Sequence, residues 1–166
     1  MKLHLTLFCV VLISLVFAAS CSPQKPNRYV AESKKEVQHP NKLILKIAES
    51  LRPIETERGF SINPQEKLAL RYAINFSVSV YSNRDAQPET SQFARRAIGN
   101  RVILFRQSDE PASGASGDEI IRKLTAWEKI PNGYILYEQS TPETHFAEHD
   151  FDLLWHVAEG AMIESN

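Results

Sequence analysis

The sequence predicts a single small α+β domain of about four helices and three short strands behind a flexible N-terminal tether. Apolar residues recur at helical spacing in several segments, while shorter runs alternate with polar residues or are continuously apolar, as strands are. About 146 residues remain once an apolar N-terminal segment is set aside, enough for one substantial core but hardly for two. The globular domain is therefore expected to cover residues 41–166.

The first part of this domain is expected to be helical. Residues 41–52 carry apolar side chains at helical spacing, and Pro53 stops the segment. A second helix is expected to start at Asn63, which can serve as the N-cap because Pro64 suits the first helical position. Its apolar stripe ends near Ala73.

Three segments are expected to be strands. Residues 76–81 alternate apolar and polar side chains, although helical spacing also continues through them. Residues 101–106 form a short apolar run between two arginines, and residues 134–137 form a similar run. Turns are expected over 83–88 and 131–133, where Asn, Asp, Pro or Gly accumulate.

The remaining segments favour helices and one exposed loop. A short helix is expected over 89–98, closed by Gly99, and a Gly- and Pro-containing loop over 108–117. Ser116 begins a capping box for a helix that runs to about Trp127. The last helix is expected to run from about residue 141 to residue 164.

The N-terminal segment is typical of an export signal. Lys2 supplies a positive charge, and residues 5–17 form an apolar stretch of about thirteen residues, where roughly 20 are needed to span a bilayer. Small residues, Ala18-Ala19-Ser20, then precede Cys21 directly. This arrangement resembles the lipobox of bacterial lipoproteins, which ends in a small residue followed by the cysteine that becomes lipidated. The family usually has Leu where this chain has Ala18.

The resemblance implies a lipid anchor. Residues 1–20 would be removed as a signal peptide, and Cys21 would carry a diacylglycerol thioether and an N-acyl chain, with no other cofactor expected. Ser22 implies sorting to the outer membrane, with the domain facing the periplasm. Residues 21–40, which are polar and contain three prolines, then form the lipidated cysteine and a flexible linker.

Cysteine count and charge exclude several classes of function. Cys9 leaves with the signal peptide, so Cys21 is the one cysteine of the mature chain. An intramolecular disulfide, a cysteine-ligated metal and a thiol nucleophile are therefore excluded. The formal net charge is −1, so the chain as a whole has no basic excess for nucleic acid, and no nucleic-acid partner is expected.

The last predicted helix holds the candidate metal ligands. His145, His149, Asp152 and His156 fall on one side of it, opposite an apolar face. Histidines four residues apart can share one divalent ion, and a carboxylate can add a third ligand. The alternative is a solvated polar face that is rich in histidine. Four groups along about 16 Å of helix cannot all reach one ion, and the H-E-x-x-H pattern is absent, so the solvated face is favoured.

Other motifs give no site. Residues 113–118 are glycine-bearing but lack the lysine of a P-loop, and no serine stands in G-x-S-x-G. Arginines 95, 96, 101 and 106 form a basic concentration that could meet an acidic partner or lipid phosphate. No function follows from it alone, because charge beside a strand commonly serves solubility.

These observations favour a protein that is not an enzyme. We expect an outer-membrane-anchored lipoprotein acting as a protein-binding, assembly or inhibitor module, held to the membrane by its lipid and engaging an envelope protein. The alternative is an envelope hydrolase or a metal-binding protein that uses the histidine-rich C-terminal helix.

Overall fold

The computed structural model describes residues 27, 29–64, 75–87, 89–111, 120–143 and 151–164. These residues form ten strands and one helix, so the predicted domain of about four helices and three strands is wrong. The elements are β1 (Lys34–Gln38), β2 (Leu43–Ala48), β3 (Leu51–Glu55), β4 (Gly59–Pro64), β5 (Asn75–Ser82), β6 (Ala94–Ile98), β7 (Arg101–Pro111), β8 (Ile120–Ile130), β9 (Gly133–Pro142), α3 (Asp152–Gly160) and β10 (Ala161–Ile163).

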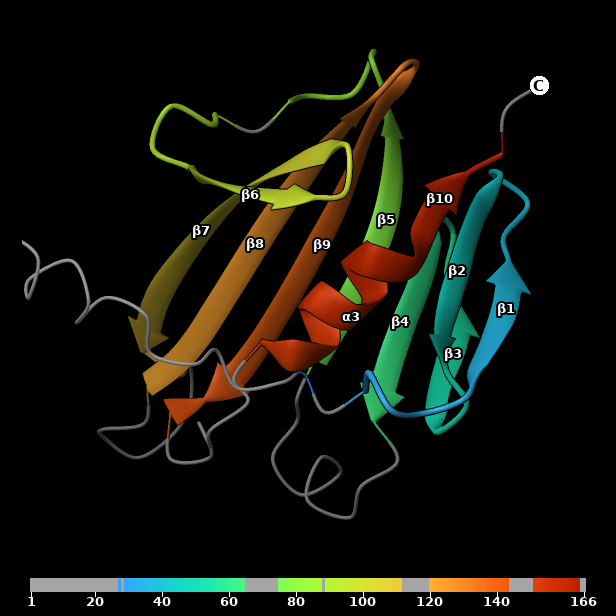
Figure 1. Ribbon diagram of the computed structural model, residues 1–166. Coiled ribbons are helices and arrows are strands. Elements are labelled where there is room, and N and C mark those ends of the chain that lie inside the picture. Colours follow the sequence, from blue (N-terminus) through green and yellow to red (C-terminus); the bar gives the residue numbers. More distant parts are fainter. Residues whose placement is uncertain are drawn as a thin grey trace, which may run out of the picture.

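The strands form two antiparallel sheets with α3 against them (Figure 1). The larger sheet has seven strands in the order β3-β4-β5-β9-β8-β7-β6, and the smaller has the order β1-β2-β10. The long strands β7, β8 and β9 pair over most of their length. Helix α3 lies on one face of the larger sheet and also contacts β2 of the smaller sheet. We call this helix-bearing face of the larger sheet the inner face and the opposite one the outer face.

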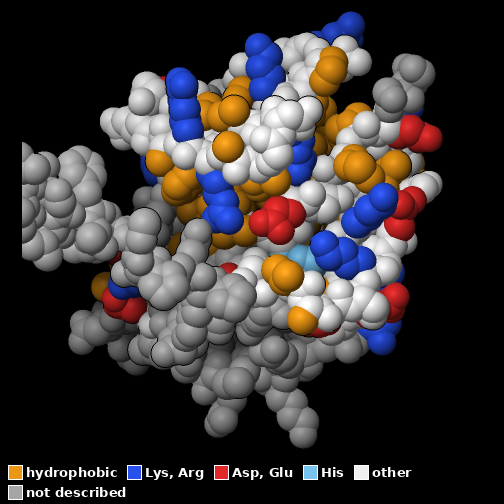
Figure 2. Space-filling view, viewed as in Figure 1, with side chains coloured by type: hydrophobic (Ala, Val, Ile, Leu, Met, Phe, Trp, Pro, Cys, Tyr) orange, Lys and Arg blue, Asp and Glu red, His pale blue; other side chains and the backbone are white. Residues whose placement is uncertain are grey.

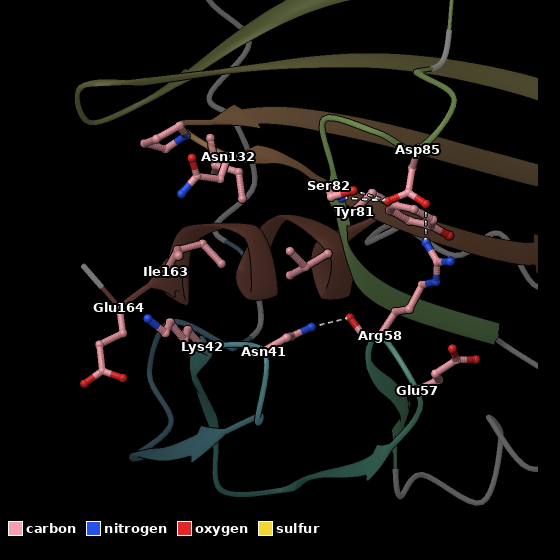
Figure 3. Close-up of a pocket in the computed structure, with 13 residues that line it drawn as sticks. Asn41, Lys42, Glu57, Arg58, Tyr81, Ser82, Asp85, Asn132, Ile163 and Glu164 are labelled. Atoms are coloured by element: carbon pink, nitrogen blue, oxygen red, sulfur yellow. Dashed lines mark hydrogen bonds and ion pairs between the residues drawn. The ribbon is translucent and has the colours of Figure 1, made fainter. Parts of the chain in front are cut away.

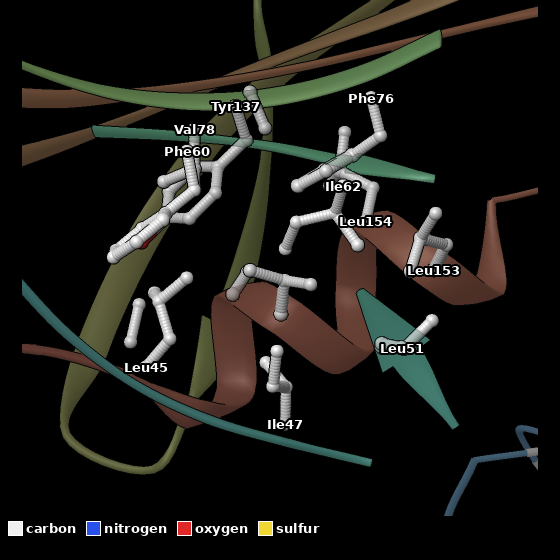
Figure 4. Packing of buried hydrophobic residues seen from close by; sticks show 14 of the residues in the cluster. Leu45, Ile47, Leu51, Phe60, Ile62, Phe76, Val78, Tyr137, Leu153 and Leu154 are labelled. Carbon is white, nitrogen blue, oxygen red and sulfur yellow. The ribbon is translucent and has the colours of Figure 1, made fainter. Parts of the chain in front are cut away.

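The core lies between α3 and the inner faces of both sheets (Figure 4). Leu43, Leu45 and Ile47 alternate along β2 and are fully buried. Leu153 and Leu154 of α3 are buried against them and against the larger sheet. Alternation along each strand sends every second side chain into this core, which is the physical basis of a sheet with one buried face.

Close approach of the backbone fixes how α3 meets β2. Gly160 ends the helix directly beside β2, where a Cβ atom would collide with the carbonyl oxygen of Lys46. Only glycine leaves room for the chain to pass there. The chain then continues into β10, which pairs with β2 from Ala161↔Leu45 to Ile163↔Leu43.

The first predicted helix, over 41–52, is replaced by β2, a two-residue turn and β3. Short apolar runs satisfy both helical and strand patterns, and here the alternation of Leu43, Leu45 and Ile47 decides the outcome. Pro53 is accommodated because β3 is an edge strand, where one missing backbone donor leaves no ladder bond unmade.

The other predicted helices differ as well. Asn63 and Pro64 end strand β4 instead of starting a helix, and the helix expected over 89–98 is replaced by strand β6. The helix expected to reach Trp127 is strand β8. The last helix is confirmed only from Asp152 to Gly160, since β9 extends through Pro142. Within the described ranges, no helix is long and apolar enough to cross a membrane.

The three predicted strands are confirmed, and each is longer than expected: β5, β7 and β9. The expected turn over 131–133 joins β8 to β9. The domain also begins earlier than residue 41, because β1 pairs with β2 and Tyr29 is buried against α3. The second half of the predicted linker over 21–40 therefore belongs to the folded domain.

One arginine joins the end of α3 to the larger sheet. The Arg101 guanidinium donates hydrogen bonds to the carbonyl oxygens of Ala158 (2.7 Å) and Ala161 (2.9 Å). The same group contacts both carboxylate oxygens of Glu128 at 3.2 Å, and the Tyr137 hydroxyl donates to that carboxylate at 2.9 Å. Arg101 therefore caps the negative end of the helix dipole and also neutralises a buried carboxylate.

Replacing Arg101 with Ala is expected to lower the free energy of unfolding by about 3–5 kcal/mol, because Glu128 would remain buried without a cation. Urea unfolding followed by circular dichroism measures this value. Arg106→Ala is the matched control on the same strand, where an exposed side chain is expected to cost about 0.5 kcal/mol or less. Equal losses in the two variants would contradict the capping role of Arg101.

Candidate functional site

A cavity of about 700 Å³ opens where three turns meet the ends of β5 and β10 (Figure 3). One wall comes from the β1–β2 turn and the end of β10, and the other from the β3–β4 turn, the end of β5 and the β8–β9 turn. Apolar side chains and a polar rim line it together. The lining residues are Asn41, Lys42, Glu57, Arg58, Val80, Tyr81, Ser82, Asp85, Ile130, Pro131, Asn132, Ile163 and Glu164.

The β1–β2 turn is fastened to the β3–β4 turn by two side chains. His39 donates from Nε2 to the Thr56 carbonyl oxygen at 2.9 Å, while its Nδ1 accepts the backbone N–H of Asn41 at 3.2 Å. The side-chain amide of Asn41 donates to the Arg58 carbonyl oxygen at 2.8 Å. Lys42 adopts a left-handed φ of 72°, which closes the turn. The two sheets are thereby held together on this side of the cavity.

The opposite rim is organised around Asp85. Its carboxylate accepts the backbone N–H of Ser82 at 2.7 Å and the Ser82 hydroxyl at 2.9 Å, and it pairs with the Arg58 guanidinium at 3.0 Å. The Ser82 N–H and the Arg58 guanidinium lower the pKa of Asp85, and the Asp85 carboxylate raises the pKa of Arg58. Both groups therefore stay charged at neutral pH.

Aromatic rings connect this rim to the outer face of the larger sheet. The Arg58 guanidinium lies 4.8 Å from the centre of the Tyr81 ring, which stacks on Tyr134 at 5.0 Å. Trp127 follows at 5.8 Å from Tyr134. The Tyr134 hydroxyl donates to the Ala86 carbonyl oxygen at 2.7 Å, and burial raises the pKa of this phenol.

The lining of the cavity combines apolar side chains with a few polar groups. The described residues that line it include no cysteine and no histidine. Ser82 donates to Asp85, but a carboxylate whose pKa is lowered is a weak base for activating a hydroxyl. Apolar side chains with a few convergent polar groups are typical of ligand or side-chain recognition.

The predicted metal ligands are only partly within the described residues. Cys21, His145 and His149 lie outside them. Asp152 opens α3, where a carboxylate suits the positive end of the helix dipole. No three His, Cys, Asp or Glu side chains gather around a common point in the described ranges.

His156 is not on a solvated face, contrary to the favoured expectation. It is 1% exposed, and its Nε2 accepts the backbone N–H of Ala48 at 2.9 Å, so the proton resides on Nδ1. The Tyr29 ring lies 5.1 Å away. This histidine holds α3 to β2, and the nitrogen that would bind a metal is already in use.

The cavity residues were missed by the sequence analysis. The sequence predicts a turn over 83–88, which includes Asp85 but not Ser82, and Arg58 stands in a stretch without a motif. A serine three residues before an aspartate is a local sign of a side-chain-stabilised turn. Nothing local shows that Asn41, Arg58 and Asp85 meet.

Burial and the nearby Lys34 lower the pKa of His156 to about 4, below its ordinary 6.5, while Glu32 acts in the opposite direction. The unfolded chain therefore binds a proton more readily than the folded one between these values, and stability falls as pH drops from 6.5 to 4. We expect wild type to lose about 2–3 kcal/mol more across this range than His156→Gln, which keeps an acceptor for Ala48 without titrating. Urea unfolding at several pH values measures the difference, and parallel curves would contradict it.

Comparisons with known proteins find a similar fold but do not identify a family. No known protein family matches the sequence. No curated protein matches it either. The fold is similar to the solution structure of cyanobacterial PsbP (CyanoP) from Synechocystis sp. PCC 6803, with a TM-score of 0.53. The match covers 87% of this chain and 98% of the other at 11% sequence identity, so the likeness concerns the fold alone.

Proposed function

We propose that this protein is a lipid-anchored envelope protein that binds a protein partner without catalysing a reaction. Its lipid would be attached to Cys21 in the outer membrane, and its domain would face the periplasm. The cavity bounded by Asn41, Arg58 and Asp85 would receive one or two side chains of the partner. The single observation that supports this proposal most directly is the polar rim whose members already bond to one another.

A preformed rim favours recognition. Because the charges of Arg58 and Asp85 and the amide of Asn41 are satisfied without a ligand, the cavity keeps its shape when empty. A partner then binds at a lower cost in conformational entropy than it would to side chains that had to be ordered first. The apolar lining from Val80, Ile130 and Ile163 adds the area that an inserted side chain can bury.

The proposed anchor would hold the domain close to the membrane. Asn27 already belongs to the domain, because its side-chain amide donates to the Asp152 carbonyl oxygen at 2.8 Å. It stands only six positions after Cys21, and even a fully extended chain of that length reaches only about 20 Å. A partner would therefore be met at the membrane surface, as suits a protein embedded in or lying on the same membrane.

Cys21→Ser is expected to abolish lipidation and to release the protein from the membrane fraction, because the anchor needs the thiol. Mass spectrometry of the mature N-terminus and fractionation of cells measure both effects. Cys9→Ser, inside the apolar segment, is the matched control and should leave lipid and location unchanged. Lipidation of the Cys21→Ser protein would contradict the proposed lipid anchor at Cys21.

A photo-crosslinking residue in place of Glu57, which is exposed at the cavity rim, is expected to capture a protein partner in living cells. Asn132→Trp should remove that adduct, because an indole at this exposed rim position would fill the cavity. The band shift on a denaturing gel and mass spectrometry of the adduct provide the measurement.

Lys46→Trp serves as the control, because Lys46 lies on β2, outside the lining of the cavity. It should leave the adduct intact. Crosslinking from Glu57 to lipid alone, or an adduct insensitive to Asn132→Trp, would show that the cavity is not the binding site.

A further inference from the structure

We infer that the partner carries an acidic, partly apolar segment, which docks on the outer face of β6, β7 and β8. This inference rests on the proposed protein-binding function and identifies the chemistry of the partner. The surface is formed by six side chains that share this face, and we call it the basic–apolar surface. Its members are Arg95, Val102, Leu104, Arg106, Trp127 and Lys129.

Strand register brings these side chains together. Arg95 stands opposite Leu104, which stands opposite Trp127, so the three form one row across the strands. Directly opposite side chains have Cβ atoms about 5 Å apart. Val102 and Arg106 lie two residues to either side of Leu104, and such positions share a face of a strand. Lys129 follows Trp127 at the same spacing.

This surface combines exposed charge with exposed apolar area. Arg95, Arg106 and Lys129 are exposed, and Val102 between them is 56% exposed. Leu104 and Trp127 are half-buried. Figure 2, viewed from the helix-bearing side, shows hydrophobic and basic side chains close together around the β6–β7 hairpin, while the outer face of the larger sheet is turned away from the viewer. Aromatic and arginine side chains around an apolar centre are the composition that protein interfaces favour.

The positive charge of the surface is not neutralised within the described part of the chain. No described carboxylate pairs with Arg95, Arg106 or Lys129. Glu128 pairs with Arg101 on the inner face, and Glu138 of β9 pairs with Lys123. Three cations therefore lie around the apolar side chains of Val102, Leu104 and Trp127, in a chain whose formal net charge is −1. An acidic segment is the complementary occupant.

Two features of the structure favour a protein, rather than the membrane surface, as the occupant of the basic–apolar surface. The chain enters the domain beside α3, through Asn27 and Tyr29, whereas the basic–apolar surface lies on the opposite face of the larger sheet. The tether thus does not press this surface onto the membrane. The buried Tyr134 packs between Tyr81 at the cavity rim and Trp127, so the two regions lie close enough for one partner to contact both.

The inference is tested with a photo-crosslinking residue in place of Val102 in the full-length chain, irradiated in living cells. We expect an adduct whose crosslinked peptide has an excess of Asp and Glu. Arg95→Gln together with Arg106→Gln should abolish this adduct, because both cations face the partner. Arg95→Lys with Arg106→Lys should retain it. Lys34→Gln together with Lys46→Gln, on β1 and β2, is the control for the loss of two positive charges.

The outcomes separate this inference from the proposed function. An adduct from Glu57 without one from Val102 would overturn the basic–apolar surface and leave cavity binding intact. An adduct from Val102 on lipid alone, on a peptide without acidic excess, or surviving the double Gln variant would also overturn it. The absence of adducts from both positions would refute the proposed function itself. Melting temperatures of the variants, expected to be unchanged at these exposed positions, confirm that they fold.

Discussion

The contacts of Arg101 are the constraint on which most of this structure depends. One guanidinium binds the last carbonyl groups of α3, the first carbonyl of β10 and the buried Glu128 carboxylate. It thus fixes where the helix ends and where β10 begins. Since Ile163 and Glu164 at the end of β10 form one wall of the cavity, the same arginine indirectly sets the shape of the candidate site. The Glu128 carboxylate would be costly to bury without a cation, so the folded state requires Arg101 at this position.

The cavity exists because two sheets approach each other at their turns without merging. His39 and Asn41 extend from the smaller sheet to carbonyl groups of the larger one, and Asp85 holds Arg58 against the opposite rim. Polar groups that satisfy one another keep the opening rigid, while the apolar lining leaves it able to receive a side chain. The buried Tyr134 packs between Tyr81 of the rim and Trp127, so the cavity lies close to the basic–apolar surface.

Strands β5, β7 and β9 could be predicted because alternation or a continuous apolar run between clear turns leaves little choice. Strand β8 could not. Ile120, Leu124 and Trp127 fit one side of a helix, yet in the sheet Leu124 faces the core and Trp127 the outer face. The charged Glu128 on the core face further obscured the strand pattern, because its partner Arg101 is 27 residues away. A short apolar run is ambiguous until its neighbours in space are known.

The sequence by itself determined what depends on neighbouring residues, namely the turn over 131–133 and the most strongly patterned strands, and it is the basis for proposing an export segment and a lipidated Cys21. The tertiary structure decided which distant residues meet. It brought Asn41 to Arg58 and Arg58 to Asp85, and it placed His156 against the Ala48 N–H, 108 residues away. These contacts depend on how remote strands pair in antiparallel register. The local propensity of a segment does not specify which residues of a distant strand will lie opposite it. For this reason the predicted solvated histidine is a buried link between α3 and β2, and the cavity was visible only in the folded chain.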